Sequence, residues 1–265
     1  MGEMVFRLLK RLFKVTALVL VVAVLAFIGR TVYGYMMDSP LLALREVVIE
    51  GCRKTSERDV LSLTQLDRRP NILNVKLGTL RSKVETHPWI EHAEIRRIFP
   101  DRISIRITER RPVAIILLDR LYYIDAHGVI FAGVPKDHHI GHPILTGLHR
   151  DDFRDHPDQS WVLVSKALRL IRVIKEARVL SQKDISEIHM DRTFGISIFT
   201  NDETIEIKLG LDHYRAKWKR LERVWRHLRQ RSPRPAYIDC NYEKRVIVRM
   251  GDTTAFYAKK LTKNA

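Results

Sequence analysis

The sequence predicts an α+β protein that is held in a membrane by a single N-terminal transmembrane helix. Three observations support this prediction. An uncharged apolar run lies near the N-terminus, and a strand-helix-helix-strand-strand pattern occupies about 65 residues after it. The remaining chain alternates like β-strands and contains two longer amphipathic helices.

The apolar run Val15–Gly29 contains no charged residue. At 1.5 Å per residue it covers only about 22 Å, which is less than the ~30 Å hydrocarbon core of a bilayer. Extending the helix to Met37 corrects the shortfall and places Tyr33 and Tyr35 at the interface. A cleaved signal peptide is the alternative, but its only A-x-A-like site lies inside the apolar run. We therefore predict an uncleaved span over 15–37.

The charges around this span predict its orientation. The basic residues before it outnumber the single acid Glu3, whereas the residues after it carry mixed charge. The positive-inside rule then keeps residues 1–14 as a cytoplasmic tail and exports the rest of the chain. The basic residues before the span are Arg7, Lys10, Arg11 and Lys14.

The composition is ordinary for a globular chain, apart from a formal charge of +16 in 265 residues. Nucleic-acid binding would explain such a charge, but no nucleic-acid-binding motif accompanies it. Proximity to anionic lipid head groups explains the charge more simply in an exported, membrane-tethered chain. The cysteines Cys52 and Cys240 are far apart in the sequence, so we expect no disulfide framework.

A short linker, Asp38–Leu44, separates the span from an α+β unit whose helices cover one sheet face. Thr55 and Ser56 are candidate N-caps for the first helix of this unit, and Pro100-Asp101 form the turn between its last two strands. The predicted elements are a strand over Leu44–Glu50, a helix through Val60–Leu63, a helix over Lys76–Thr86, and strands through Ala93–Ile95 and Ile103–Ile107.

The chain beyond Pro112 is predicted to be rich in strands. Its last long helix has an apolar face formed by Tyr214, Trp218, Leu221, Trp225 and Leu228, and an opposite basic face formed by Arg215, Lys219, Arg223 and Arg226. The predicted elements are strands over Ala114–Leu118, Leu121–Ile124 and Val129–Ala132, a helix over Trp161–Val179, strands over Ile185–His189, Gly195–Phe199 and Ile205–Leu209, a helix over Asp212–Gln230, and a closing strand pair over Ala236–Asp239 and Arg245–Arg249.

The stretch LREVVIEG and the later stretch His87–Ala114 (HPWIEHAEIRRIFPDRISIRITERRPVA) resemble the POTRA domain of the bacterial FtsQ/DivIB cell-division family. The resemblance implies a POTRA domain over 44–112, a β-domain over 113–250 and a tail over 251–265. Trp89, Ile90 and Ala93 read as core residues of this motif. Glu109 and Arg110 read as a solvated pair at the domain boundary, with direct contact to a partner as the alternative.

The segment YIDCNYEKRVIVR resembles the closing strands of the FtsQ β-domain. In that family the last strand presents an edge that pairs with an extended segment of FtsB. The resemblance therefore implies that Tyr242, Arg245, Val246 and Val248 bind a partner. Cys240 stands where the family often has an aliphatic residue.

A segment rich in His and Asp lies between these motifs, with His138, His139, His142, His149 and His156 among its residues. A zinc site and a polar surface loop broken by Pro143 and Pro157 are both compatible with it. The spacing fixes no metal geometry, so we predict the loop and no bound metal. The catalytic spacings of serine hydrolases, zinc proteases, P-loops and dinucleotide sites are also missing from the sequence, so we expect no cofactor, no small-molecule substrate and no enzymatic activity.

We therefore expect a bitopic scaffold of the bacterial division machinery. The resemblance implies recruitment of FtsB and FtsL, with FtsW- and FtsI-type synthases as further partners, at the division septum of the inner membrane. A POTRA-type chaperone for exported polypeptides is the alternative of a different class, and an extracytoplasmic cell-wall hydrolase is the enzymatic one.

Overall fold

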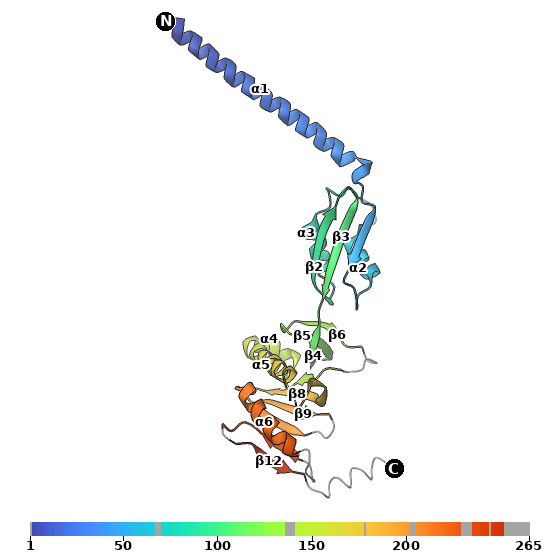
Figure 1. Cartoon of the computed structure of the whole chain (residues 1–265), viewed down its shortest axis with the longest axis vertical. Helices are drawn as coiled ribbons and strands as arrows, with labels where there is room; N and C mark the ends of the chain where they lie inside the picture. The colour runs from blue at the N-terminus through green and yellow to red at the C-terminus, as the bar shows by residue number, and fades with distance from the viewer. Residues whose placement is uncertain are drawn as a thin grey trace. The chain divides into compact units, whose positions relative to one another are not determined.

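The structure is a computed structural model that describes residues 2–66, 70–135, 141–177, 179–201, 205–228, 235–243 and 245–251, with side chains from residue 13 onward. The chain divides into two compact units, Met1–Arg110 and Arg111–Ala265. Figure 1 shows the elements of each unit along the chain.

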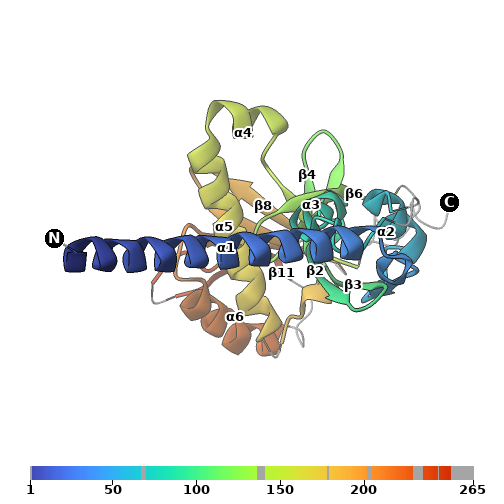
Figure 2. The ribbon, with the colours of Figure 1, turned by 90° about the horizontal axis from the view of Figure 1, so that it is seen from above.

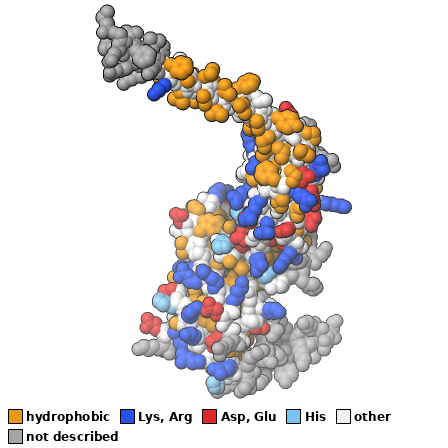
Figure 3. Space-filling view, turned by 45° about the horizontal axis from the view of Figure 1, so that its top comes forward, with side chains coloured by type: hydrophobic (Ala, Val, Ile, Leu, Met, Phe, Trp, Pro, Cys, Tyr) orange, Lys and Arg blue, Asp and Glu red, His pale blue; other side chains and the backbone are white. Residues whose placement is uncertain are grey.

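The N-terminal segment is one continuous helix, α1 (Gly2–Asp38). Its part Phe13–Asp38 is long and apolar enough to cross a membrane, and none of its apolar window is buried against the rest of the chain. Hydrophobic side chains cover much of the part Phe13–Asp38 in Figure 3. Pro40 then begins a short 3-10 helix (Pro40–Leu42), which Ser39 caps by accepting a hydrogen bond from the Leu41 amide.

The rest of the first unit has the predicted order of strand, two helices and two strands. The strands form a three-stranded sheet of order β1-β3-β2, in which β1 pairs parallel and β2 antiparallel with β3. As predicted, Ser56 caps the first helix by accepting a hydrogen bond from the Asp59 amide. The elements are β1 (Glu46–Glu50), α2 (Glu57–Thr64), α3 (Leu77–Val84), β2 (Ile90–Ile98) and β3 (Arg102–Glu109).

Strand β3 shows why these residues form this fold. Its residues Ile103, Ile105 and Ile107 alternate with exposed or partly exposed polar residues, and they join Val60 of α2 and Leu80 of α3 in one hydrophobic core. The helices therefore cover one face of the sheet, while charged residues occupy the other.

The second unit is built on a nine-stranded sheet of order β12-β11-β10-β9-β8-β7-β4-β5-β6. Helices α5 and α6 pack against each other and share one hydrophobic core with the sheet; both appear in the view of Figure 2. The elements are β4 (Pro112–Leu117), β5 (Leu121–Asp125), β6 (Ile130–Gly133), β7 (Ile144–Thr146), α4 (Arg150–Asp155), α5 (Pro157–Lys175), β8 (Ile185–Asp191), β9 (Gly195–Thr200), β10 (Glu206–Gly210), α6 (Tyr214–Leu228), β11 (Pro235–Asp239) and β12 (Ile247–Met250).

The prediction of one polar surface loop between β6 and α5 was wrong for two elements. Strand β7 lies inside the sheet, pairs in parallel with both β4 and β8, and buries Leu145 completely. Three residues are too few to show an alternating pattern in the sequence. Helix α4 begins with a capping box, in which His149 and Asp152 satisfy each other's backbone amides. The predicted loop residues His138 and His139 lie outside the described residues.

Candidate functional site

Strand β12 forms one end of the nine-stranded sheet. It pairs antiparallel with β11, and the register places Val248 opposite Ile238 and Ile247 opposite Asp239. Among the residues that the structure describes, no other strand pairs with β12. Within the described residues, one row of backbone N–H and C=O groups on this strand therefore has no strand partner.

The side chains along this edge alternate between two environments. Val246 and Val248 are partly buried and pack against the hydrophobic core of the second unit. Arg245, Ile247 and Arg249 are exposed on the opposite side. Of the sequence-predicted partner residues, the two valines thus pack against the protein's own core, and Arg245 is exposed.

Tyr242 lies in the connection between β11 and β12, before the strand begins at Ile247. Its side chain is 42% exposed. The guanidinium carbon of Arg245 lies 4.8 Å from the centroid of the Tyr242 ring, which is within the range of a cation–π contact. The structure thus brings Tyr242 and Arg245 together at one end of the open edge.

A second tyrosine, Tyr237 of β11, was not singled out from the sequence. Lys208 of β10 and Arg249 of β12 lie over its ring at 5.1 and 6.0 Å from the centroid. Burial raises the pKa of Tyr237 to about 12, and the hydrogen bond that its hydroxyl donates to Asp239 adds to the shift. This neutral ring between two cations links the last three strands of the sheet.

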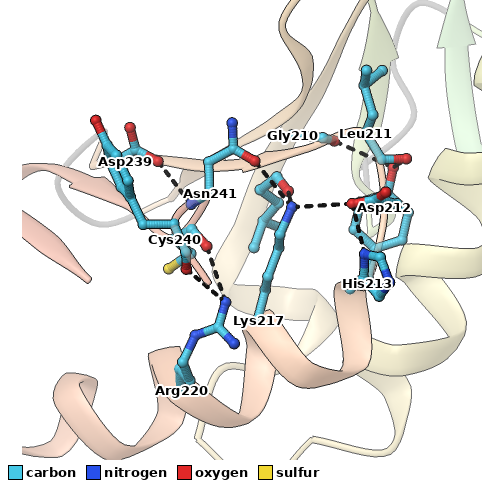
Figure 4. Close-up of polar contacts among 12 residues, drawn as sticks. Gly210, Leu211, Asp212, His213, Lys217, Arg220, Asp239, Cys240 and Asn241 are labelled. Atoms are coloured by element: carbon cyan, nitrogen blue, oxygen red, sulfur yellow. Dashed lines mark hydrogen bonds and ion pairs between the residues drawn. The ribbon is translucent and has the colours of Figure 1, made fainter. Parts of the chain in front are cut away.

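Two basic side chains of α6, Lys217 and Arg220, contact the connection between β11 and β12 near Cys240 and Asn241 (Figure 4). The Lys217 side chain is buried, and its ammonium group donates to the Leu209 carbonyl at 2.8 Å and to Asn241 Oδ1 at 3.0 Å. One turn later, Arg220 donates to the carbonyl of Tyr242 at 2.9 Å and to that of Cys240 at 3.4 Å. Two basic side chains of one helix therefore fix three consecutive residues of the connection.

The sequence contained a signal for Lys217 that the prediction did not use. Lys217 lies in phase with the apolar residues Tyr214, Trp218 and Leu221, all of which are buried as predicted. A lysine within an apolar stripe indicates a buried ammonium group that needs oxygen partners. One of its partners, Asn241, lies 24 residues later in the sequence, so the sequence alone could not identify it.

Glu109 in the POTRA-like motif has a different environment from the predicted solvated pair. Its Oε1 accepts hydrogen bonds from the backbone amides of Arg53, Lys54 and Thr55 at 2.8–2.9 Å, and from the Thr55 hydroxyl at 2.7 Å. Burial alone would raise the pKa of Glu109, but these hydrogen bonds together hold it below its usual value. Glu109 thus anchors the loop that follows β1.

No group of three or more His, Cys, Asp or Glu side chains that could hold a metal ion occurs within the described parts of the chain. Cys52 and Cys240 are both free thiols. The chemistry that the arrangement around β12 offers is backbone pairing with another strand, flanked by an aromatic ring and basic side chains.

Two family models match the chain. Residues 42–110 match "POTRA domain, FtsQ-type", and residues 114–241 match "Cell division protein FtsQ/DivIB, C-terminal". The second match ends one residue before Tyr242.

Three curated proteins named "Cell division protein FtsQ" are similar over most of the chain. The protein of Syntrophotalea carbinolica is 31% identical over 87% of this chain and 80% of its own length. The protein of Geobacter sp. (strain M21) is 30% identical over 85% of this chain and 82% of its own length. The protein of Geotalea daltonii is 26% identical over 91% of this chain and 88% of its own length.

Proposed function

Because the chain belongs to the FtsQ/DivIB family of cell division proteins, we propose that it is a bitopic scaffold that captures an extended segment of an FtsB-type partner at the open edge of β12. In this proposal the partner adds one strand to the sheet. FtsL is recruited together with FtsB, and FtsW- and FtsI-type synthases follow at the division septum.

The observation that carries this proposal is the position of β12 at the end of its sheet. A strand edge carries unsatisfied donors and acceptors at regular spacing, and an incoming strand satisfies them. The exposed Tyr242 ring and the guanidinium groups of Arg245 and Arg249 lie along the same edge. Backbone pairing then contributes affinity, and these side chains contribute selectivity for the partner.

The membrane anchor supports the same proposal, because partners in one bilayer meet at a raised effective concentration. We propose that residues 1–14 face the cytoplasm and that the chain beyond the span lies on the periplasmic side of the inner membrane. Protease added outside sealed spheroplasts should then digest the C-terminal units and spare an N-terminal tag. Protection of the C-terminal units would contradict this orientation.

The partner site is tested with the full chain in detergent micelles and the FtsB-type protein of the same bacterium. Tyr242→Glu should weaken capture at least tenfold, because it replaces an apolar anchor with a charge. Val129→Glu is the matched control: Val129 is 41% exposed in the turn between β5 and β6, at the other end of the sheet, so the same replacement should leave capture unchanged. Equal capture by Tyr242→Glu and the wild type would refute this assignment of the site.

Hydrogen exchange distinguishes strand addition from a side-chain contact. Strand addition should slow exchange of β12 amides in the complex, because new inter-strand hydrogen bonds form there. Exchange in β6, the strand at the other end of the sheet, should stay the same. If the partner binds but exchange of the β12 amides is not slowed, the complex does not form by strand addition.

A further inference from the structure

We infer that Lys217 and Arg220 of α6 are positioning residues that preorganise the connection carrying Tyr242 for partner capture. This inference rests on the proposed function. Lys217 and Arg220, together with the three residues that they hold, form a clamp; the held residues are Cys240, Asn241 and Tyr242.

The Lys217 ammonium group has three donors and finds three oxygen acceptors. Besides Leu209 O and Asn241 Oδ1, it lies 3.5 Å from Asp212 Oδ1. The side chain of Lys217 is only 6% exposed, so each of these acceptors replaces water that the fold excludes. The ammonium group thus joins the end of β10, the start of α6 and the connection after β11.

Asp212 is the negative partner in this group. A hydrogen bond from His213, and further the positive charges of His213 and Lys217, hold the pKa of Asp212 below its usual value. The carboxylate is therefore ionised at neutral pH and faces the buried ammonium group. A neutral side chain in place of Lys217 would remove the hydrogen bond that joins α6 to the Asn241 side chain.

Gly210 provides the room that this arrangement needs. Its φ is +68°, and a Cβ at this position would lie 2.3 Å from Asn241 Oδ1. A larger residue would displace the Asn241 amide from its place beside Lys217. The backbone amide of Asn241 is fixed independently by a 2.8 Å hydrogen bond to Asp239 Oδ1. The connection is therefore held from the sheet side and from the helix side.

Arg220 completes the clamp by acting on the backbone of Tyr242 itself. Its hydrogen bond to the Tyr242 carbonyl sets the direction in which the chain leaves the buried Cys240 and approaches β12. Arg220 holds only the backbone of Tyr242, and the residue stays 42% exposed. This is the arrangement expected of an anchor residue that is fixed before the partner arrives.

The expected effect follows from population arithmetic. If loss of one clamp contact leaves the native conformation of the connection in about a tenth of the molecules, the apparent affinity falls about tenfold. The loss should appear in the association rate, because fewer molecules are ready to bind at any moment. A residue that contacts the partner directly would change the dissociation rate instead.

The test compares Arg220→Gln and Asn241→Ala with Arg223→Gln in the full chain in detergent, with the FtsB-type protein of the same bacterium as the probe. Arg223 is exposed on the same helix and forms no ion pair with the described residues, so it is the matched control. The two clamp variants should associate about tenfold more slowly. They should also exchange the amides of Asn241, Tyr242 and Glu243 faster when free, while exchange in β8 and β9 stays unchanged. Arg220→Lys, which keeps one donor, should recover part of the affinity.

The outcomes separate this inference from the proposed function. If Tyr242→Glu abolishes capture while both clamp variants bind like the wild type, the β12 site stands and the positioning role is wrong. If Tyr242→Glu has no effect, the proposed site is wrong. Faster exchange throughout the sheet in Arg220→Gln would show general destabilisation of that variant. The association rates of Asn241→Ala and Arg220→Lys would then test the positioning role. Unchanged association in both variants would overturn the inference.

Discussion

At the scale of single residues, Cys240 shows how burial controls chemistry. It is completely buried, and its amide donates to the Lys208 carbonyl at 2.9 Å. Burial raises the pKa of its thiol to about 12, and the nearby Asp239 carboxylate adds to the shift. Cys240 therefore acts as a small apolar residue at the position where the family resemblance implied an aliphatic one.

We predict that Cys240 in the folded chain resists alkylation at about pH 8, since the reactive thiolate is almost absent at this pH and the sulfur is enclosed. The partly exposed Cys52 is the internal control and should be modified first. Mass spectrometry after brief treatment with iodoacetamide measures both sites. Equal labelling of the two cysteines in native buffer would contradict the burial of Cys240.

Glu109 leads to a prediction about pH. Its folded-state pKa lies below the ordinary value, so its carboxylate stabilises the fold above the ordinary pKa and loses this effect as the pH falls through the folded-state pKa. Glu109→Ala should destabilise the POTRA-like unit by about 2 kcal/mol at neutral pH, because the Thr55 amide and hydroxyl lose their acceptor.

The difference in the free energy of unfolding between Glu109→Ala and the wild type should become smaller at a pH well below the ordinary carboxyl pKa. At such a pH the wild-type side chain is also neutral. Thermal unfolding at about pH 7 and about pH 3 measures it. Glu91→Ala is the control, since Glu91 is an exposed acid of the same unit. A constant difference at both pH values would show that the charge of Glu109 is unimportant.

The sequence was informative about candidate residues and less informative about their contacts. It identified Tyr242 and Arg245, which the structure places together. It contained a signal for the burial of Lys217, but it gave no means of finding Asn241 Oδ1 and Tyr242 O as acceptors, because these lie 24 and 22 residues after Lys217 and Arg220 and meet them only after folding. Contacts of this kind depend on sheet topology, which hydrophobic periodicity does not specify.

At the scale of elements, α6 shows how an amphipathic pattern becomes a buried face. Trp218, Leu221 and Trp225 are at most 6% exposed, whereas Arg223 on the opposite side is exposed. Trp218→Ala should destabilise the second unit by about 3–5 kcal/mol, because it leaves a large cavity in the core. Arg223→Ala should change stability by less than about 0.5 kcal/mol. Urea unfolding of the full chain in detergent measures both, and similar losses would contradict the assignment of the two faces.

Elements with a long periodic pattern were predicted well, and short ones were missed. Buried side chains recur about every 3.6 residues in the helices around Val60, Leu80 and Leu221. They recur every two residues in strand β3. Strand β7 has three residues and α4 has six, so neither repeats its pattern often enough to be recognised. Yet β7 joins β4 to β8 and makes one continuous sheet out of two groups of strands.

At the scale of the whole molecule, the chain combines a helix that can span a membrane with two units that each have their own hydrophobic core. The predicted domain limits at 44–112 and 113–250 stay a prediction, as do the cytoplasmic tail at 1–14 and the C-terminal tail at 251–265. In the proposed function these parts have separate roles. The helix restricts the protein to one bilayer, and the open edge of β12 recruits a partner there.

The two hydrophobic cores share no residue, which leads to a prediction about unfolding. Leu80 is buried in the core of the first unit, and Ile171 of α5 is buried in that of the second. Leu80→Ala and Ile171→Ala should each destabilise their own unit by about 2–5 kcal/mol. Because the residues have no common core neighbours, the effects should add within about 0.5 kcal/mol in the double variant.

Hydrogen exchange of the full chain in detergent resolves the two units in one experiment. Leu80→Ala should speed exchange in β2 and β3 and leave β8 and β9 unchanged, and Ile171→Ala should do the reverse. Each variant thus serves as the control for the other. If either variant speeds exchange in both sheets, the units unfold as one cooperative body. The open edge of β12 would then depend on the stability of the POTRA-like unit as well as on its own core.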